Sequence, residues 1–286
     1  MGRKAGDIMS NNYHTKSIDE LTFTDDGMFQ AVMHDPEACS KIVEHLLHVQ
    51  VDHIDYPELE KTIAPYYTSK GIRMDVYIKD SSRIIDIEMQ ASSMDALGKR
   101  TRYYQSMIDI DSLMKGDDYS MLKESYILFI CKYNPFKHEE GEFLGLPCYT
   151  FRTVCSENSE VNLNDKTTKV VYNASAYEKE KDTWIRSFLS YVYTGQTGED
   201  DFANYLSAMV EKIKQDEKFR SLYLSMNLHD RDIRMEAIKE ATQQKAIEDA
   251  ISFYENGVSI EIIAQSLKIS VEKLQEILTK RIPVHP

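Results

Sequence analysis

The chain lacks a cysteine motif, a long apolar run and an excess of basic residues, and each absence excludes a class of protein. Its four cysteines, at positions 39, 131, 148 and 155, form no CxxC pair and show no zinc-binding spacing. We therefore interpret them as reduced thiols in or near the core, which indicates a reducing compartment and a cytoplasmic protein. No stretch approaches the ~18 apolar residues of a membrane span, and residues 1–20 lack the apolar centre of a secretory signal.

Basic residues are outnumbered, with 34 Lys and Arg against 47 Asp and Glu, a net charge of −13 and a pI of about 5.1. This balance argues against a protein that coats polyanions in general. It does not exclude a nuclease, because metal-ligating carboxylates are themselves acidic and phosphate contacts can be local. Hydrophobic residues make up 42% of the 286 positions, which is enough for one large folded domain or two modest ones.

Residues 71–90 alternate between apolar and polar side chains with the period of a β-strand, and they predict a β-hairpin with an acidic face. The first arm carries Asp75 on its polar face, and the second arm carries Asp86, Glu88 and Gln90 on its own polar face. The polar tetrad at 79–82 is typical of the turn between two such arms.

With that tetrad as the turn, Asp75 lies opposite Asp86 and becomes the diagonal neighbour of Glu88, at a backbone separation of roughly 7 to 8 Å. Two carboxylates at this separation can reach one divalent cation, which would also remove the repulsion between the facing acids. The alternative is an exposed sheet face that is acidic and binds no ion.

The rest of the pattern predicts helices before and after the hairpin, followed by further strands. Asp35 and Pro36 are typical of an N-cap and a first helical position, and they open a helix that runs to about His48. Residues 125–132 form an apolar run with the length of a central strand covered on both faces. The other predicted elements are a short helix within 22–34, a helix at 95–113 and two strands at 148–154 and 169–172. This order indicates a mixed α+β or α/β domain with a mixed central sheet.

The helix after the hairpin has a cluster of positive charge. Lys99, Arg100 and Arg102 lie within four positions, directly after the acidic strand. A positive patch beside a carboxylate site is what a bound phosphate backbone needs. The alternative is an ordinary basic helix face.

From residue 181 onward the pattern is helical, with an extension over 181–245 and a separate C-terminal segment over 246–286. Two short helices at 260–267 and 271–278, joined by a tight turn, resemble a helix-turn-helix. The second helix contains Glu272 and Glu276 beside its few DNA-compatible side chains. Packing or oligomerisation is therefore favoured over base readout.

Three motifs in order carry a family resemblance: Asp75 on one strand, residues 88–90 (Glu-Met-Gln) on the next, and Tyr103-Tyr104 on the basic helix that follows. This arrangement resembles the PD-(D/E)XK nuclease superfamily and, more narrowly, the Rpn family of recombination-promoting nucleases and transposases, whose second acid lies in an ExQ motif. Segments 24–29 and 115–119 and the C-terminal helices also fit, so the resemblance covers most of residues 22–278. It predicts a tail at 1–20 and a nuclease-like domain at 21–180.

The resemblance implies a restriction-endonuclease-like core and a Mg²⁺-dependent endonuclease that hydrolyses DNA phosphodiester bonds in recombination or transposition. Asp75 and Glu88 would be the metal ligands, with the backbone carbonyl of Met89 as a third, and Mn²⁺ could replace Mg²⁺. The proline of the superfamily name is replaced by Met74.

The resemblance also marks a departure at Gln90, a candidate catalytic residue that stands where the superfamily more often has lysine. Glutamine can orient a water molecule, but it cannot act as a cation. We expect Lys99 or Arg102 to supply the missing charge. These two residues and Gln105 are candidates for DNA contacts, although a helix-surface role is equally open for Gln105.

The expected partner is DNA, with no membrane and no organic cofactor. A homodimer is expected if the product is a double-strand break, because two cuts need two active sites. The alternative function is a catalytically inactive nuclease-fold protein that acts as a DNA- or protein-binding regulatory module.

Overall fold

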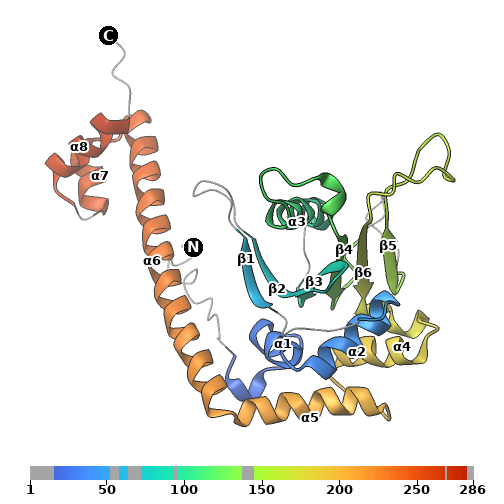
Figure 1. The fold of residues 1–286 in the computed structure, drawn as a ribbon. Coiled ribbons are helices and arrows are strands. Elements are labelled where there is room, and N and C mark those ends of the chain that lie inside the picture. The colour runs from blue at the N-terminus through green and yellow to red at the C-terminus, as the bar shows by residue number, and fades with distance from the viewer. Residues whose placement is uncertain are drawn as a thin grey trace. The chain divides into compact units, whose positions relative to one another are not determined.

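The protein is described here by a computed structural model that covers residues 16–51, 58–63, 72–92, 96–136, 145–267 and 269–281. The chain forms two compact units, Met1–Arg220 and Ser221–Pro286 (Figure 1). Residues 1–15 of the predicted tail, and residue 71 at the start of the predicted hairpin, lie outside the described residues.

The first unit contains a six-stranded sheet with the order β1-β2-β3-β4-β6-β5. The parallel pairs are β3–β4 and β4–β6, and the other three pairs are antiparallel, which confirms the predicted mixed sheet. The strands are β1 Glu58–Ile63, β2 Ile72–Lys79, β3 Arg83–Gln90, β4 Glu124–Cys131, β5 Cys148–Phe151 and β6 Thr167–Asn173. Sequence analysis predicted all of these except β1.

Helices cover both faces of the sheet (Figure 1). Helix α3, Leu97–Ser112, lies on one face, and its Tyr104, Met107 and Ile108 pack with Ile127 and Phe129 of β4. On the other face lie α1 Asp26–Met33, α2 Pro36–Leu47 and α4 Thr183–Thr194. The sheet is therefore buried on both sides, as the apolar run of β4 predicted.

Local sequence signals account for the start of α2, and a contact with the sheet fixes its position. The Asp35 side chain accepts a hydrogen bond from the Ala38 N–H at 2.9 Å, and Pro36 occupies the first turn, as predicted. Its apolar stripe is buried, and the Leu46 carbonyl accepts a hydrogen bond from the Tyr172 hydroxyl of β6 at 2.8 Å. This bond fixes α2 over the parallel part of the sheet.

The β2–β3 hairpin is present, but its predicted register was wrong by two residues. Tyr77 faces Asp86 and Lys79 faces Ile84, and the Asp80 N–H donates to the Arg83 carbonyl at 3.0 Å. The turn is shorter than the tetrad predicted because the Asp80 side chain accepts hydrogen bonds from the N–H groups of both Ser82 and Arg83. A shift of two residues leaves every side chain on its predicted face.

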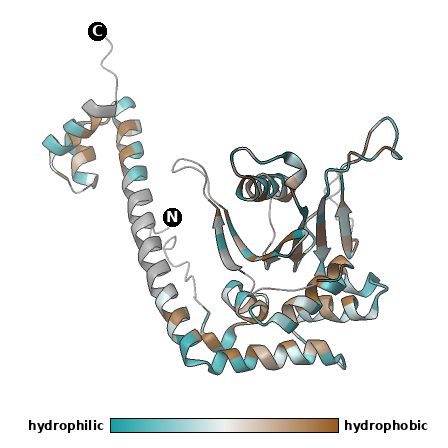
Figure 2. Ribbon diagram, viewed as in Figure 1, coloured by the Kyte–Doolittle hydropathy of each residue, from teal (hydrophilic) through white to brown (hydrophobic). Residues whose placement is uncertain are grey.

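The helical extension continues with α5, Asp201–Gln215, and hydrophobic and hydrophilic residues are interspersed along α4 and α5 (Figure 2). In the second unit, α6 Glu217–Glu255, which begins in the first unit, is followed by α7 Ile260–Leu267 and α8 Val271–Arg281. The two predicted short helices are therefore confirmed. They pack around a small apolar core formed by Ala250, Ile263, Ala264, Leu274 and Leu278. In the described part of the chain, no helix combines the length and apolar composition that crossing a membrane requires.

Candidate active site

Asp75 and Glu88 lie side by side where the β2–β3 ladder ends. The Asp75 N–H donates to Glu88 Oε1 at 3.1 Å, and the Met89 N–H donates to Asp75 Oδ2 at 3.0 Å. Each carboxylate is thus held by the backbone of the opposite strand. The corrected register makes the two acids direct neighbours, closer than the diagonal arrangement that the sequence predicted.

Both carboxyl groups are in a poorly solvated environment. Glu88 is 1% exposed, and its burial, together with the charge of Asp75, raises the pKa of Glu88 to about 8. Burial and the nearby Asp26 raise the pKa of Asp75 to about 6. Two adjacent acids that resist ionisation in this way are typical of a functional site that lacks its counter-charge.

Arg100 brings a positive charge to this acidic pair. Its Nη2 donates to Glu88 Oε2 at 2.7 Å and its Nη1 donates to Gln90 Oε1 at 3.3 Å. The Tyr104 hydroxyl, one turn along α3, accepts hydrogen bonds from Arg100 Nε at 2.9 Å and Nη2 at 2.7 Å. Arg100 therefore joins Glu88, Gln90 and Tyr104 into one network.

The predicted source of this charge was wrong, because Lys99 and Arg102 are both exposed. Neighbouring helical residues point about 100° apart, and residues three apart share a face, so Arg100 faces the sheet while Lys99 and Arg102 lie together on the outer face. A signal was present in the sequence: Arg100 and Tyr104 are four positions apart within the buried stripe of the helix. Lys99 and Arg102 remain candidates for DNA contacts on the outer surface of α3.

Gln105 is not on the DNA-facing surface. Its side chain is buried, with Nε2 donating to Asp109 Oδ1 at 2.9 Å and Oε1 accepting from the Ser125 hydroxyl at 3.0 Å. These bonds tie α3 to the first buried residue of β4. Burial therefore contradicts both roles considered for Gln105, the DNA contact and the helix-surface role, and its side chain instead bridges helix and sheet.

Two acids outside the expected pair also affect the site. Asp86 is fully buried, neither of its carboxylate oxygens has a hydrogen-bond partner among the described residues, and burial followed by the charge of Glu88 raises its pKa well above the ordinary value. Asp26, at the start of α1, accepts a hydrogen bond from Arg73 Nη2 at 2.9 Å, and its charge contributes to the raised pKa of Asp75.

The donor set fits a hard divalent cation. Asp75, Glu88 and Asp86 bring three acidic groups to the guanidinium of Arg100, and carboxylate oxygens are the ligands that Mg²⁺ and Mn²⁺ prefer. Within the described residues, no group of three or more His, Cys, Asp or Glu side chains is arranged to hold one ion. Two carboxylates completed by water and phosphate oxygens are a common arrangement for Mg²⁺. Met89 contributes its N–H to Asp75, and ligation by its carbonyl stays a prediction.

Comparison with known proteins gives one match. Residues 34–241 match a family model described as PD-(D/E)XK nuclease family transposase. This segment contains Asp75, Glu88, Gln90 and Arg100. No curated protein and no solved structure matches the chain.

Proposed function

Because the chain belongs to the PD-(D/E)XK nuclease family transposases, we propose that it is a divalent-metal-dependent endonuclease that hydrolyses DNA phosphodiester bonds in recombination or transposition. The observation that carries this proposal is the pairing of Asp75 and Glu88 across the hairpin: the Asp75 N–H holds the Glu88 carboxylate, and the Met89 N–H holds the Asp75 carboxylate. Both have raised pKa values, so a cation would be needed to ionise the pair at neutral pH.

Asp75 and Glu88 would hold Mg²⁺, with Mn²⁺ as a substitute, and the bound ion would polarise the scissile phosphate and lower the pKa of an attacking water molecule. The protein's own contribution is to fix both carboxylates before the substrate arrives. The N–H groups of Asp75 and Met89 perform this task, because each holds one carboxylate oxygen, while Arg100 holds the second oxygen of Glu88.

Arg100 would act on Glu88 and on the phosphate charge. A guanidinium does not lose its proton near neutral pH, so Arg100 cannot serve as a general base. Its bond to Glu88 Oε2 keeps this carboxylate oriented, and its donors can also stabilise the negative charge that develops on a phosphoryl group. Tyr104 acts as a positioning residue because it holds the guanidinium from the same helix.

The side-chain amide of Gln90 would orient, by hydrogen bonding, either a water molecule or the guanidinium of Arg100. Its Oε1 accepts from Arg100 Nη1, and its Nε2 lies 3.5 Å from the Ser92 hydroxyl. The outer surface of α3 would contact DNA phosphates through Lys99 and Arg102, both exposed.

A plasmid-nicking assay with titrated Mg²⁺ and Mn²⁺ tests the proposal. Asp75→Asn and Glu88→Gln should each lower cleavage by about a hundredfold or more, because each removes a charged oxygen ligand. Glu160→Gln, at an exposed glutamate, is the matched control and should cleave like the wild type. Circular dichroism would establish that the variants fold. Wild-type cleavage by both site variants would contradict the proposal.

The second candidate function is a nuclease-fold protein that binds DNA or protein without cutting. The observation that favours it is Arg100, which occupies an oxygen of Glu88 while the lysine position holds Gln90. This function predicts that the wild type binds DNA but leaves plasmid intact at every concentration of Mg²⁺ or Mn²⁺.

A further inference from the structure

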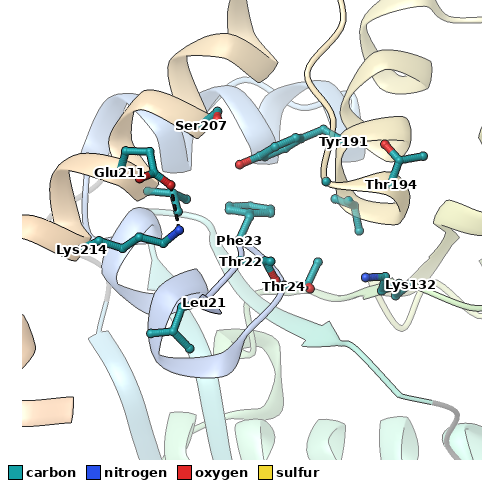
Figure 3. Close-up of a pocket in the computed structure, with 13 residues that line it drawn as sticks. Leu21, Thr22, Phe23, Thr24, Lys132, Tyr191, Thr194, Ser207, Glu211 and Lys214 are labelled. Carbon is teal, nitrogen blue, oxygen red and sulfur yellow. Dashed lines mark hydrogen bonds and ion pairs between the residues drawn. The ribbon is translucent and has the colours of Figure 1, made fainter. Parts of the chain in front are cut away.

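A cavity of about 190 Å³ lies between the segment before α1, the end of β4 and helices α4 and α5 (Figure 3). Phe23 is one of its lining residues, and most of the other lining residues have polar side chains. Its lining residues with hydroxyl or ammonium groups are Thr22, Thr24, Lys132, Tyr191, Thr194, Ser207 and Lys214. The space suits a small ligand with several hydrogen-bond acceptors.

Two lysines stand on opposite sides of this cavity (Figure 3). Lys132 is half-buried, and among the described residues its ammonium group has no hydrogen-bond or ion-pair partner. Lys214 is 8% exposed and donates to Glu211 Oε1 at 2.7 Å, while the Glu211 side chain is 65% exposed. The ammonium group of Lys214 is therefore balanced by a solvated carboxylate, whereas the ammonium group of Lys132 is available to a ligand.

The cavity adjoins the candidate active site at two points. The Lys132 N–H donates to the Gln90 carbonyl at 2.9 Å, and the Gln90 side chain contacts Arg100. On the other side, Asp25 Oδ2 accepts hydrogen bonds from the N–H and hydroxyl of Thr22 at 2.7 and 2.8 Å. The next residue, Asp26, is ion-paired with Arg73 of β2. The end of β3 and the start of α1 therefore link residues of the cavity to residues of the candidate active site.

A cavity lined by several hydroxyl groups and by an ammonium group that has no partner among the described residues is suited to a tetrahedral oxyanion, and the carboxylate of Glu211 is already neutralised by Lys214. We infer that this cavity is a phosphate-binding subsite, with Lys132 as its principal cation, that holds a backbone phosphate of the DNA strand bound at the active site. The inference takes its substrate class from the proposed function. It adds a positioning contact on the face of the sheet opposite α3.

DNA binding in the presence of EDTA tests the subsite without requiring cleavage. Fluorescence anisotropy with a labelled DNA duplex would be measured over a range of salt concentrations for Lys132→Gln, Lys132→Arg and Lys181→Gln. Lys132→Gln should weaken binding by about tenfold and lower the slope of log K against log salt by about 1. Lys132→Arg keeps the charge and should bind like the wild type, as should Lys181→Gln, which removes an exposed lysine outside the cavity. Wild-type affinity and slope for Lys132→Gln would overturn the inference.

A second measurement distinguishes backbone phosphate from free phosphate. The thermal unfolding midpoint would be measured in inorganic phosphate and in chloride at equal ionic strength, for the wild type and for Lys132→Gln. Stabilisation by phosphate that disappears in Lys132→Gln, with DNA binding unchanged, would overturn the assignment to the DNA strand. Weaker DNA binding by Lys132→Gln in a protein that nicks no plasmid would refute the proposed nuclease activity and leave the subsite standing.

Discussion

The two ends of the β2–β3 hairpin both bury acidic side chains, but these side chains differ in their hydrogen bonds and in the charges around them. At the turn, Asp80 Oδ1 accepts hydrogen bonds from the N–H groups of Ser82 and Arg83 at 2.7 and 2.6 Å, and Lys123 Nζ donates to the Asp80 carbonyl at 2.6 Å. Towards the open end, Asp86, which faces Tyr77 within the ladder, has no hydrogen-bond partner for its carboxylate among the described residues, and it lies near Glu88 and Asp75, where the ladder ends.

This difference shows which buried acid marks a functional site. Asp80 is buried because the turn needs an acceptor there: its Oδ1 accepts both turn hydrogen bonds, and its Oδ2, which has no hydrogen-bond partner among the described residues, lies 3.8 Å from Arg83 Nη1. Asp75, Glu88 and Asp86 all lie near the guanidinium of Arg100, and Arg73 is also near Asp75, yet the pKa values of all three acids are raised. Burial alone is thus weak evidence for function, whereas a deficit of partners and counter-charge points to a missing ligand.

The largest expected difference between the two ends is in pH dependence. Because the folded-state pKa of Glu88 is about 8, above its unfolded value of about 4.3, the folded protein binds a proton more tightly than the unfolded chain. The free energy of unfolding of the metal-free protein should therefore fall as the pH rises from about 5 to about 8. Urea denaturation in EDTA measures this dependence. Glu88→Gln should flatten this pH dependence, and Asp80→Asn, the control at the turn, should preserve it. A wild-type free energy of unfolding that rises with pH would contradict the expectation.

Next in size is the effect of Arg100 on cleavage. Arg100→Met removes the cation that contacts Glu88 and Gln90, and we expect nicking activity to fall by about a hundredfold. Arg100→Lys should recover part of the activity because it keeps the charge but loses the planar donor geometry. The matched control is Arg102→Met on the exposed face of the same helix, which should weaken DNA binding with little change in the rate for bound substrate. If Arg100→Met and Arg102→Met lowered nicking activity equally, Arg100 would have no specific role at the active site.

A substitution at the turn should have a moderate effect on the free energy of unfolding and no effect on the rate of cleavage. Asp80→Ala leaves the N–H groups of Ser82 and Arg83 without their acceptor, and we expect a loss of about 1 to 3 kcal/mol in the free energy of unfolding. Its nicking rate, measured below the unfolding transition, should match that of the wild type. A stable Asp80→Ala variant with reduced cleavage would break the distinction between the two ends.

The smallest expected effect is at Lys123, whose ammonium reaches the Asp80 carbonyl from the segment before β4. Lys123→Met keeps most of the apolar stem and removes one hydrogen bond to the turn, so we expect a loss of about 0.5 to 1.5 kcal/mol. Denaturant titration measures the loss, and the plasmid assay should show no change. A loss larger than that of Asp80→Ala would show that the turn depends on Lys123 more than on its own aspartate.

Much of the fold could be predicted from local patterns. The Asp35-Pro36 start of α2, the apolar run of β4 and the alternation in β2 and β3 each specify an element from within a few residues. The strand β1, Glu58–Ile63, was not predicted. Its sequence is largely polar, because it lies at the edge of the sheet and pairs only with β2, so no apolar run marks it.

The sequence by itself determined that Asp75 and Glu88 share one face of the hairpin, because side chains alternate along a strand and a register shift of two residues preserves the face. It could not determine that the two acids are direct neighbours, since the length of the turn depends on the side-chain bonds of Asp80. Nor could it determine which of three clustered basic residues enters the site. Only the packing of α3 on the sheet decided this, because the rotation of a helix about its axis is fixed by contacts with residues distant in sequence, and that rotation directs Arg100 inward.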